Sequence, residues 1–394
     1  MKKSVKIIIS VLAIVLICAI SFDVLLVNNS KQETPANTTQ NIENQATESE
    51  EKTYSNPVEA QARKMVENMT LYEKVGQMLL YYIPKEEPLK KMARWQFGGY
   101  ILFSRNFQNS TPANTRSEIE EYQKASKIPA FMAVDEEGGG VNRVSQFSQY
   151  RSEPFHAGIT NYQKGGWQAV EADAKDKSEF MLDLGINTVL APVADVPYSR
   201  SDYIYSRAFS TDADSVSEYV SKTVGTMKEN NLLSCVKHFP GYGNNGDTHS
   251  QIIRDKRKLS TFKSRDLLPF KAGIKAGADM IMVSHNIVDA FDKKYPASLS
   301  KKVHKYIRNE MNYDGVIITD GLGMNGVVDF VGGDKGEAAI KSVLAGNDML
   351  CANNYKIQYP AVLKAVKDGK IKEKQIDESV KRILILKLNR KIIK

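Results

Sequence analysis

The chain has 394 residues, of which 42% are hydrophobic and 25% charged; this is ordinary for a globular protein and long enough for one large barrel or two modest domains. The formal net charge is +8, but no nucleic-acid-binding motif accompanies it, so we expect no nucleic-acid partner. We interpret the basic cluster in residues 370–394 as a solvated helix face. No two of the three cysteines have metal-ligand spacing, and Cys235 and Cys351 read as small core residues rather than a disulfide.

The residue pattern of the N-terminus predicts export. Lys2, Lys3 and Lys6 precede the apolar run 7–22, which is the pattern of a secretory signal. We therefore predict that residues 1–27 are either a cleaved signal peptide or a retained membrane anchor with its lysines inside, and the sequence leaves both open. Either one predicts an extracellular or cell-surface protein, with membrane attachment in the second case.

Residues 28–56 are rich in Asn, Gln, Thr, Ser and Glu and have almost no large apolar side chains, so we predict a disordered polar linker. The folded domain is predicted to span residues 57–394. It begins with an amphipathic helix over 58–69, followed by a capping box at Thr70 and Glu73 that opens the next helix.

Short apolar runs then alternate with helix-compatible segments. Eight runs are predicted to be strands: 77–83, 99–103, 130–134, 188–193, 232–236, 280–284, 315–319 and 348–351. Eight strands alternating with helices predict an α/β fold, a single (β/α)₈ barrel of the TIM type.

Titratable residues follow several of these runs, where a barrel enzyme places its catalytic groups. They are Asp135, Asp195, Lys237, His238, His285 and Asp320. The loop after the fifth run also carries Asp247 and His249, and it holds glycines at 241, 243 and 246. We expect these residues to meet at one end of the barrel and the glycines to permit the loop to move.

Two chemistries are compatible with this set. One is metal-assisted hydrolysis, with ligands drawn from His238, Asp247, His249, His285 and Asp320. The other is metal-free group transfer, with Asp320 as nucleophile and His249 as acid and base, oriented by Asp247. We favour the second and expect no metal or other cofactor, because paired histidines at ligand spacing are absent and Lys237 is a poor neighbour for a cation.

Four segments together resemble glycoside hydrolase family 3, and most of all its bacterial β-N-acetylglucosaminidase branch. They are 237–243, 247–249, 135–143 and 318–320. The resemblance implies that Asp320 forms a glycosyl-enzyme intermediate, while His249 is the acid/base and Asp247 its partner. It also implies that the substrate sugar is bound by Asp135, Arg143, Arg207, Lys237 and His238.

The implied activity is a retaining exo-β-N-acetylglucosaminidase that acts on cell-wall fragments or related glycans, and we expect it to be a monomer. Two alternatives stay open: a β-glucosidase, β-xylosidase or glycoside phosphorylase on the same fold, or a non-catalytic sugar-binding surface protein. The chain departs from the family pattern at Gly140, where Arg is frequent, and at Tyr242, where His is frequent. Its loop between Gly243 and Asp247 is one residue shorter than in many relatives.

Overall fold

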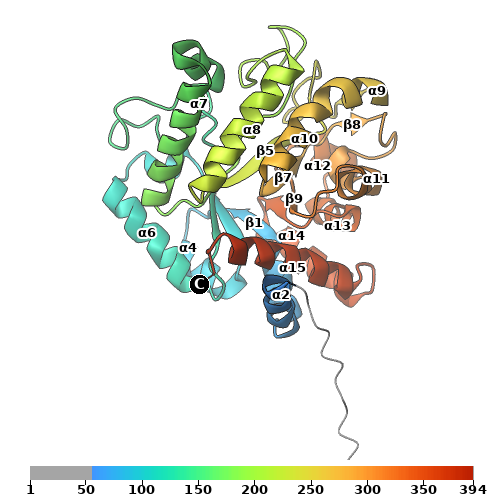
Figure 1. The fold of residues 1–394 in the computed structure, drawn as a ribbon. Coiled ribbons are helices and arrows are strands. Elements are labelled where there is room, and N and C mark those ends of the chain that lie inside the picture. The colour runs from blue at the N-terminus through green and yellow to red at the C-terminus, as the bar shows by residue number, and fades with distance from the viewer. Residues whose placement is uncertain (1–55, 394) are drawn as a thin grey trace, which may run out of the picture. The chain divides into compact units, whose positions relative to one another are not determined.

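Eight parallel strands form the centre of the computed structural model, which describes residues 56–393 (Figure 1). Their order around the barrel is β10-β1-β2-β3-β4-β5-β7-β9. Their bounds are β1 Leu79–Tyr82, β2 Gly99–Leu102, β3 Phe131–Val134, β4 Thr188–Val189, β5 Leu233–Phe239, β7 Met280–Val283, β9 Val316–Thr319 and β10 Leu350–Ala352. Leu79 pairs with Leu350, and a parallel bridge between Ile318 and Met349 links the two ends of the sheet. The prediction of a (β/α)₈ barrel is confirmed.

The strands form where the sequence places continuous apolar runs, since parallel strands in a barrel are covered on both faces. All eight predicted runs contain a strand, and two boundaries differ by more than two residues. β4 stops at Val189 instead of 193, because Pro192 has no N–H for the ladder. β5 continues past 236 to include Lys237 and His238, which we expected beyond the strand end; Phe239 still pairs with Val283 of β7.

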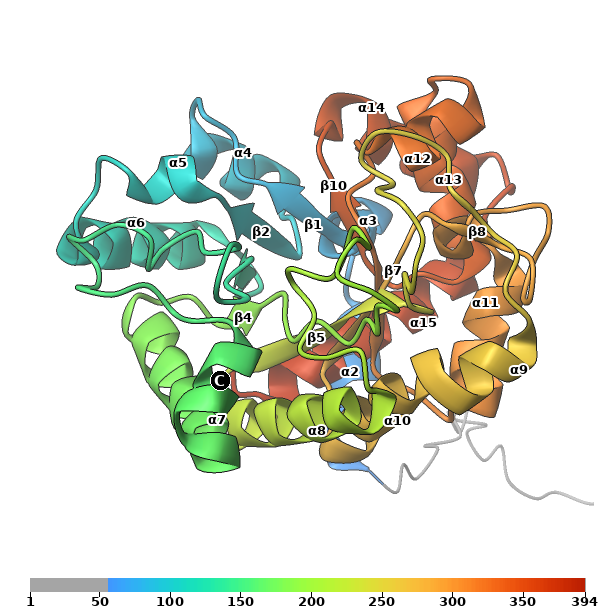
Figure 2. The same ribbon diagram turned by 90° about the horizontal axis from the view of Figure 1, so that it is seen from above.

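Helices surround the strands, as the view from above shows (Figure 2). The predicted helix 58–69 is α2, Pro57–Glu67, capped by the Asn56 side chain. The predicted capping box opens α3, Leu71–Gln77, with both of its hydrogen bonds formed by Thr70 and Glu73. The others are α4 Pro88–Trp95, α5 Ser104–Phe107, α6 Pro112–Ala125, α7 Gly158–Asp183, α8 Ala213–Glu229, α9 Leu259–Thr261, α10 Leu267–Ala276, α11 Lys301–Lys305, α12 Asn325–Val328, α13 Lys335–Ala345, α14 Tyr355–Lys367 and α15 Glu373–Asn389.

A second, two-stranded sheet was not predicted. β6, Arg254–Asp255, pairs in parallel with β8, Ile287–Val288. These strands lie in the long connections after β5 and β7, and their two-residue length leaves almost no periodic signal in the sequence. The pairing fixes the far end of the loop that carries Asp247 and His249.

The interpretation of the C-terminal basic cluster as a solvated face is wrong for three of its residues. Lys387 is fully buried, and its Nζ lies 2.8 Å from Gln77 Oε1. Arg382 pairs with Asp348 at 3.2 Å, and the Arg390 guanidinium pairs with a buried Asp279 at 2.9 Å. α15 is therefore bound to the barrel through its basic residues as well as its apolar ones.

The predicted signal or anchor segment and the linker up to residue 55 lie outside the described residues. Within residues 56–393, no helix has both the length and the apolar character that crossing a membrane requires. Cys235 and Cys351 are free and buried, as expected, whereas Cys18 falls outside this range.

Candidate active site

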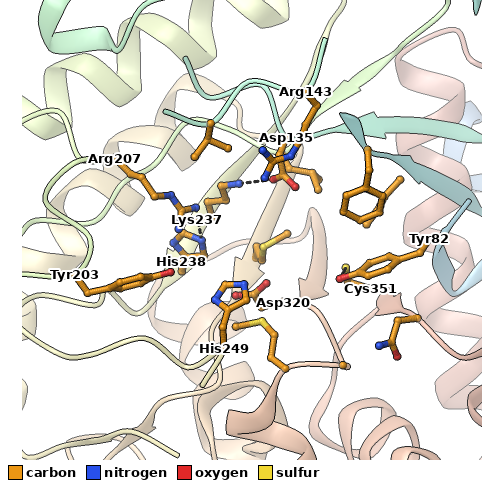
Figure 3. Close-up of a pocket in the computed structure, with 18 residues that line it drawn as sticks. Tyr82, Asp135, Arg143, Tyr203, Arg207, Lys237, His238, His249, Asp320 and Cys351 are labelled. Atoms are coloured by element: carbon orange, nitrogen blue, oxygen red, sulfur yellow. Dashed lines mark hydrogen bonds and ion pairs between the residues drawn. The ribbon is translucent and has the colours of Figure 1, made fainter. Parts of the chain in front are cut away.

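A cavity of about 530 Å³ opens at the carboxyl ends of the strands (Figure 3). Seven of the eight predicted catalytic and sugar-binding residues line it: Asp135, Arg143, Arg207, Lys237, His238, His249 and Asp320. The eighth, Asp247, does not line the cavity but is bonded to His249. Tyr82, Phe103, Cys351 and Asn353 complete much of the remaining wall. The barrel thus brings together residues from both halves of the chain.

A buried ion cluster forms one side of the cavity. Lys237 Nζ lies 2.7 Å from both Asp135 Oδ1 and Glu137 Oε1. Arg207 donates to Glu137 through two parallel bonds, Nε to Oε2 at 2.9 Å and Nη2 to Oε1 at 2.7 Å. Glu137 was not among the predicted site residues, although it lies within the segment that carries Asp135.

The charges in this cluster stabilise one another. Burial opposes the charge on Glu137, but the cations of Lys237 and Arg207 hold the pKa of its carboxyl well below the ordinary value. Burial likewise opposes the charge on Lys237, yet the carboxylates of Asp135 and Glu137 raise the pKa of its ammonium above the ordinary value. Lys237 and Arg207 therefore stay cationic and can donate to sugar hydroxyls from fixed positions.

His238 is held by Asp195, a fully buried carboxylate after β4. Asp195 Oδ2 lies 2.7 Å from His238 Nδ1, and it also accepts the backbone N–H of His238 at 3.1 Å. The Arg207 guanidinium can only donate, and it lies 3.2 Å from His238 Nε2. These partners assign the proton to Nδ1 and a lone pair to Nε2, so the ring is fixed in one orientation.

Glu136 organises the segment that carries Arg143. This buried carboxylate accepts the backbone N–H groups of Arg143 at 2.7 Å, Val144 at 2.9 Å and Ser145 at 3.0 Å. Within residues 56–393 the Arg143 guanidinium forms no ion pair, and Figure 3 shows it reaching into the cavity near Asp135. Because Glu136 holds the backbone at Arg143 and the guanidinium has no ion-pair partner among the described residues, Arg143 is available to bind a ligand.

Asp320 stands directly after β9, at the bottom of the cavity. Gly321 donates its N–H to Asp320 Oδ1 at 2.7 Å. Burial disfavours the charged carboxyl, but the Gly321 N–H opposes burial, and on balance the pKa of Asp320 lies below its ordinary value. Asp320 is therefore ionised, as a carboxylate nucleophile must be.

His285 supports the turn after Asp320 rather than facing the cavity. Its Nε2 lies 3.1 Å from the Gly321 carbonyl oxygen and its Nδ1 lies 2.7 Å from Ser298 Oγ. Burial lowers the pKa of its ring, which keeps it neutral. The sequence placed His285 correctly at a strand end, and the structure shows that it acts there as a buried support.

His249 and Asp247 form a hydrogen-bonded pair at the edge of the cavity. His249 Nδ1 lies 2.7 Å from Asp247 Oδ1, which also accepts the His249 N–H at 2.8 Å. Burial opposes the charge on Asp247, but these bonds outweigh it and lower the pKa of the carboxyl. With Nδ1 directed at Asp247, the Nε2 atom has no hydrogen-bond partner among residues 56–393 and can exchange a proton. Figure 3 shows the ring close to Asp320.

The alternative set of metal ligands is not gathered into a site. His238 and His285 each direct both ring nitrogens at other protein groups. In the described part of the chain, no group of three or more His, Cys, Asp or Glu side chains is arranged to hold a metal ion.

The sequence of the chain matches a known protein family. The model of the glycosyl hydrolase family 3 N-terminal domain matches residues 70–386. The chain belongs to this family. It is 31% identical over 280 residues to a β-hexosaminidase of Methylococcus capsulatus, covering 69% of this chain and 80% of that protein. A β-hexosaminidase of Photobacterium profundum is 33% identical over 266 residues, which are 65% of this chain and 75% of the relative.

A solved family 3 structure has a similar fold. The β-N-acetylglucosaminidase of Paenibacillus sp. str. FPU-7 superposes with a TM-score of 0.76 at 29% identity, over 82% of this chain. The match spans 63% of that protein, so this chain corresponds to somewhat less than two thirds of its length.

Proposed function

We propose that this family 3 protein is a retaining exo-β-N-acetylglucosaminidase that releases terminal N-acetylglucosamine from cell-wall fragments or related glycans. The observation that carries the proposal is the combination, in one cavity, of an ionised Asp320 and of His249, which is hydrogen-bonded to Asp247. The names of the matched relatives support the choice of N-acetylhexosaminides as substrates.

The first step uses both groups at once. The Asp320 carboxylate attacks the anomeric carbon while the bond from that carbon to the leaving oxygen breaks. Protonated His249 gives its Nε2 proton to the leaving oxygen, and Asp247 stabilises the imidazolium that precedes this transfer. The products are the released alcohol and a glycosyl ester on Asp320.

The second step reverses the roles. Neutral His249 takes a proton from water, whose oxygen attacks the anomeric carbon and displaces the Asp320 carboxylate. Two inversions at the same carbon retain the β configuration. In both steps Asp135, Lys237 and Arg207 bind the sugar hydroxyls, and the ion pairs of the buried cluster hold these side chains in place.

The test compares an aryl β-N-acetylglucosaminide with an aryl β-glucoside, with and without phosphate. We expect hydrolysis of the first alone, with the β-anomer of N-acetylglucosamine as first product by NMR. Asp320→Asn keeps the shape of the side chain and should abolish turnover. Faster cleavage of the glucoside, a requirement for phosphate, or tight sugar binding without turnover would each replace the proposal by one of the alternatives.

We also propose that the protein is exported and acts outside the cytoplasmic membrane. The support is the pattern of lysines followed by the apolar run 7–22. Fractionation of cells that express the full chain, with N-terminal sequencing of the mature protein, separates a cleaved signal from a retained anchor. Recovery of the uncleaved chain from the cytosol would refute export.

A further inference from the structure

The loop between β5 and β6, residues 240–253, carries Asp247 and His249, and its glycines predicted free movement. Its start is nevertheless bound to the barrel. Arg257 donates to the Gly241 carbonyl oxygen at 2.9 Å and is itself bound by Asp255 and Asp266, each at 2.6 Å. These contacts hold the base of the loop, but they do not reach the residues that bear the chemistry.

A second contact does reach them. The hydroxyl groups of Tyr242 and Thr248 lie 2.6 Å apart, and the two side chains are only 1% and 0% exposed. Thr248 stands between Asp247 and His249 in the sequence, so its position determines theirs. A hydrogen bond between buried hydroxyls has no competing water, and removing one partner leaves the other unsatisfied.

Thr248 is also held from the opposite direction. Its carbonyl oxygen accepts the N–H of Gly326 at 2.9 Å, and the His249 carbonyl accepts the N–H of Asn325 at 3.3 Å. Both donors begin α12, shortly after Asp320. A Cβ at position 326 would lie 2.8 Å from the Thr248 carbonyl oxygen, so the close approach requires glycine.

Tyr242 itself is fixed on the sugar-binding side of the cavity. Its N–H donates to Asp195 Oδ1 at 2.7 Å, and its ring meets the His238 ring edge-on at 5.2 Å between centroids. The Tyr203 ring also packs against Tyr242, with 5.6 Å between the ring centroids. Tyr242 therefore contacts Asp195 and His238 on one side and Thr248, the neighbour of His249, on the other.

We propose that Tyr242 and Thr248 form a clasp that holds His249 beside Asp320 before substrate binds. Both are positioning residues, and the inference rests on the proposed role of His249 as acid and base. The clasp gives a function to the tyrosine at a position where the family pattern frequently has histidine. A loop that is already ordered loses little conformational freedom when substrate arrives.

The kinetic test uses two aryl β-N-acetylglucosaminides that differ in their need for a proton. The 2,4-dinitrophenyl group leaves without one, whereas the unsubstituted phenyl group needs His249. We expect Tyr242→Phe and Thr248→Val to lower kcat/KM for the phenyl substrate about tenfold, a fraction of the 10²–10⁴ that a general acid contributes. The dinitrophenyl substrate should lose less than about twofold, and Thr248→Ser, which keeps the hydroxyl, should behave as wild type.

The two hydroxyls should also act as one unit. The double variant Tyr242→Phe/Thr248→Val should be no slower than either single variant, because the energies of contacting groups are not additive. An equal loss on both substrates, additive losses, or no loss in any variant would overturn the clasp. If the wild type cleaves neither substrate, the proposed function fails instead.

Amide hydrogen exchange tests the clasp without substrate turnover. Amide hydrogen exchange at Gly326 reports its bond to the Thr248 carbonyl. We expect exchange at Gly326 to be at least tenfold faster in Tyr242→Phe, while exchange in the central strand β7 stays as in wild type. Unchanged protection at Gly326 would show that the loop stays in place without the tyrosine hydroxyl.

Discussion

Replacing Glu137 by glutamine tests whether charge holds the ion cluster beside the cavity. Glu137 is 7% exposed and binds two cations, Lys237 at 2.7 Å and Arg207 at 2.7 and 2.9 Å. Glutamine keeps the shape and removes the charge. Lys237 would retain Asp135, whereas Arg207 would lose its only carboxylate among the described residues.

Breaking a buried ion pair from one side costs about 3–5 kcal/mol, and the remaining Asp135 contact argues for the lower end of this range. A loss of about 3 kcal/mol corresponds to a fall in Tm of roughly 6–12 °C in a domain of 150–250 residues, and somewhat less in a larger one. KM for an aryl β-N-acetylglucosaminide should rise in parallel, because Arg207 and Lys237 would no longer be fixed.

The effect should depend on pH. The pKa of Glu137 is lower in the folded protein than the ordinary value of 4.5, so its stabilising contribution is complete above that pH and declines as the pH falls below it. The Tm values of wild type and Glu137→Gln should therefore approach each other in acid.

Thermal unfolding followed by circular dichroism provides the measurement, and Glu171→Gln provides the matched control. Glu171 pairs with Lys222 at 3.1 Å but is 43% exposed, so its loss should change stability by less than about 1 kcal/mol. If Glu137→Gln unfolds at the same temperature as this control and keeps its KM, charge pairing does not hold the cluster and the reasoning fails.

Three further predictions follow from single contacts. Burial lowers the pKa of Lys387 to about 7, so between pH 7 and pH 10 the unfolded chain binds a proton that the folded protein does not bind. The free energy of unfolding should therefore rise with pH, by at most about 1.4 kcal/mol per pH unit. Urea unfolding at pH 7 and pH 9 should show this rise, and Lys387→Met should abolish it. Gly326→Ala should displace the Thr248 carbonyl and lower kcat/KM at least tenfold, whereas the control Gly225→Ala, where the added methyl group in α8 meets no atom, should stabilise the fold by about 0.5–1 kcal/mol. Activity and Tm are measured for both variants, and full activity of Gly326→Ala would contradict the predicted displacement. Gly140→Arg meets no atom within 4 Å of its Cβ, so its Tm should match wild type, and a marked fall would show that this turn is more constrained than its geometry indicates.

Much of the barrel could be predicted from local pattern. Continuous apolar runs mark strands that are covered on both faces, and the capping box at Thr70 marks a helix start whose bonds are entirely local. The positions of Asp135 and Asp320 directly after their strands follow from the same runs, because all parallel strands of a barrel end at one face. The family resemblance added their proposed roles.

What the tertiary structure decided is which partner each buried charge meets. Asp195 holds His238 from 43 residues away, Asp135 meets Lys237 across 102 residues, and Lys387 reaches Gln77 across 310. No local pattern contains these pairs, since they depend on which strand ends become neighbours when the barrel forms. The sequence alone determined that apolar strands alternate with helices in the order of a barrel and that reactive groups follow the strands. Only the folded barrel could separate the groups that face the cavity from those that support them, because that distinction depends on long-range packing and on the hydrogen-bond partners that packing supplies.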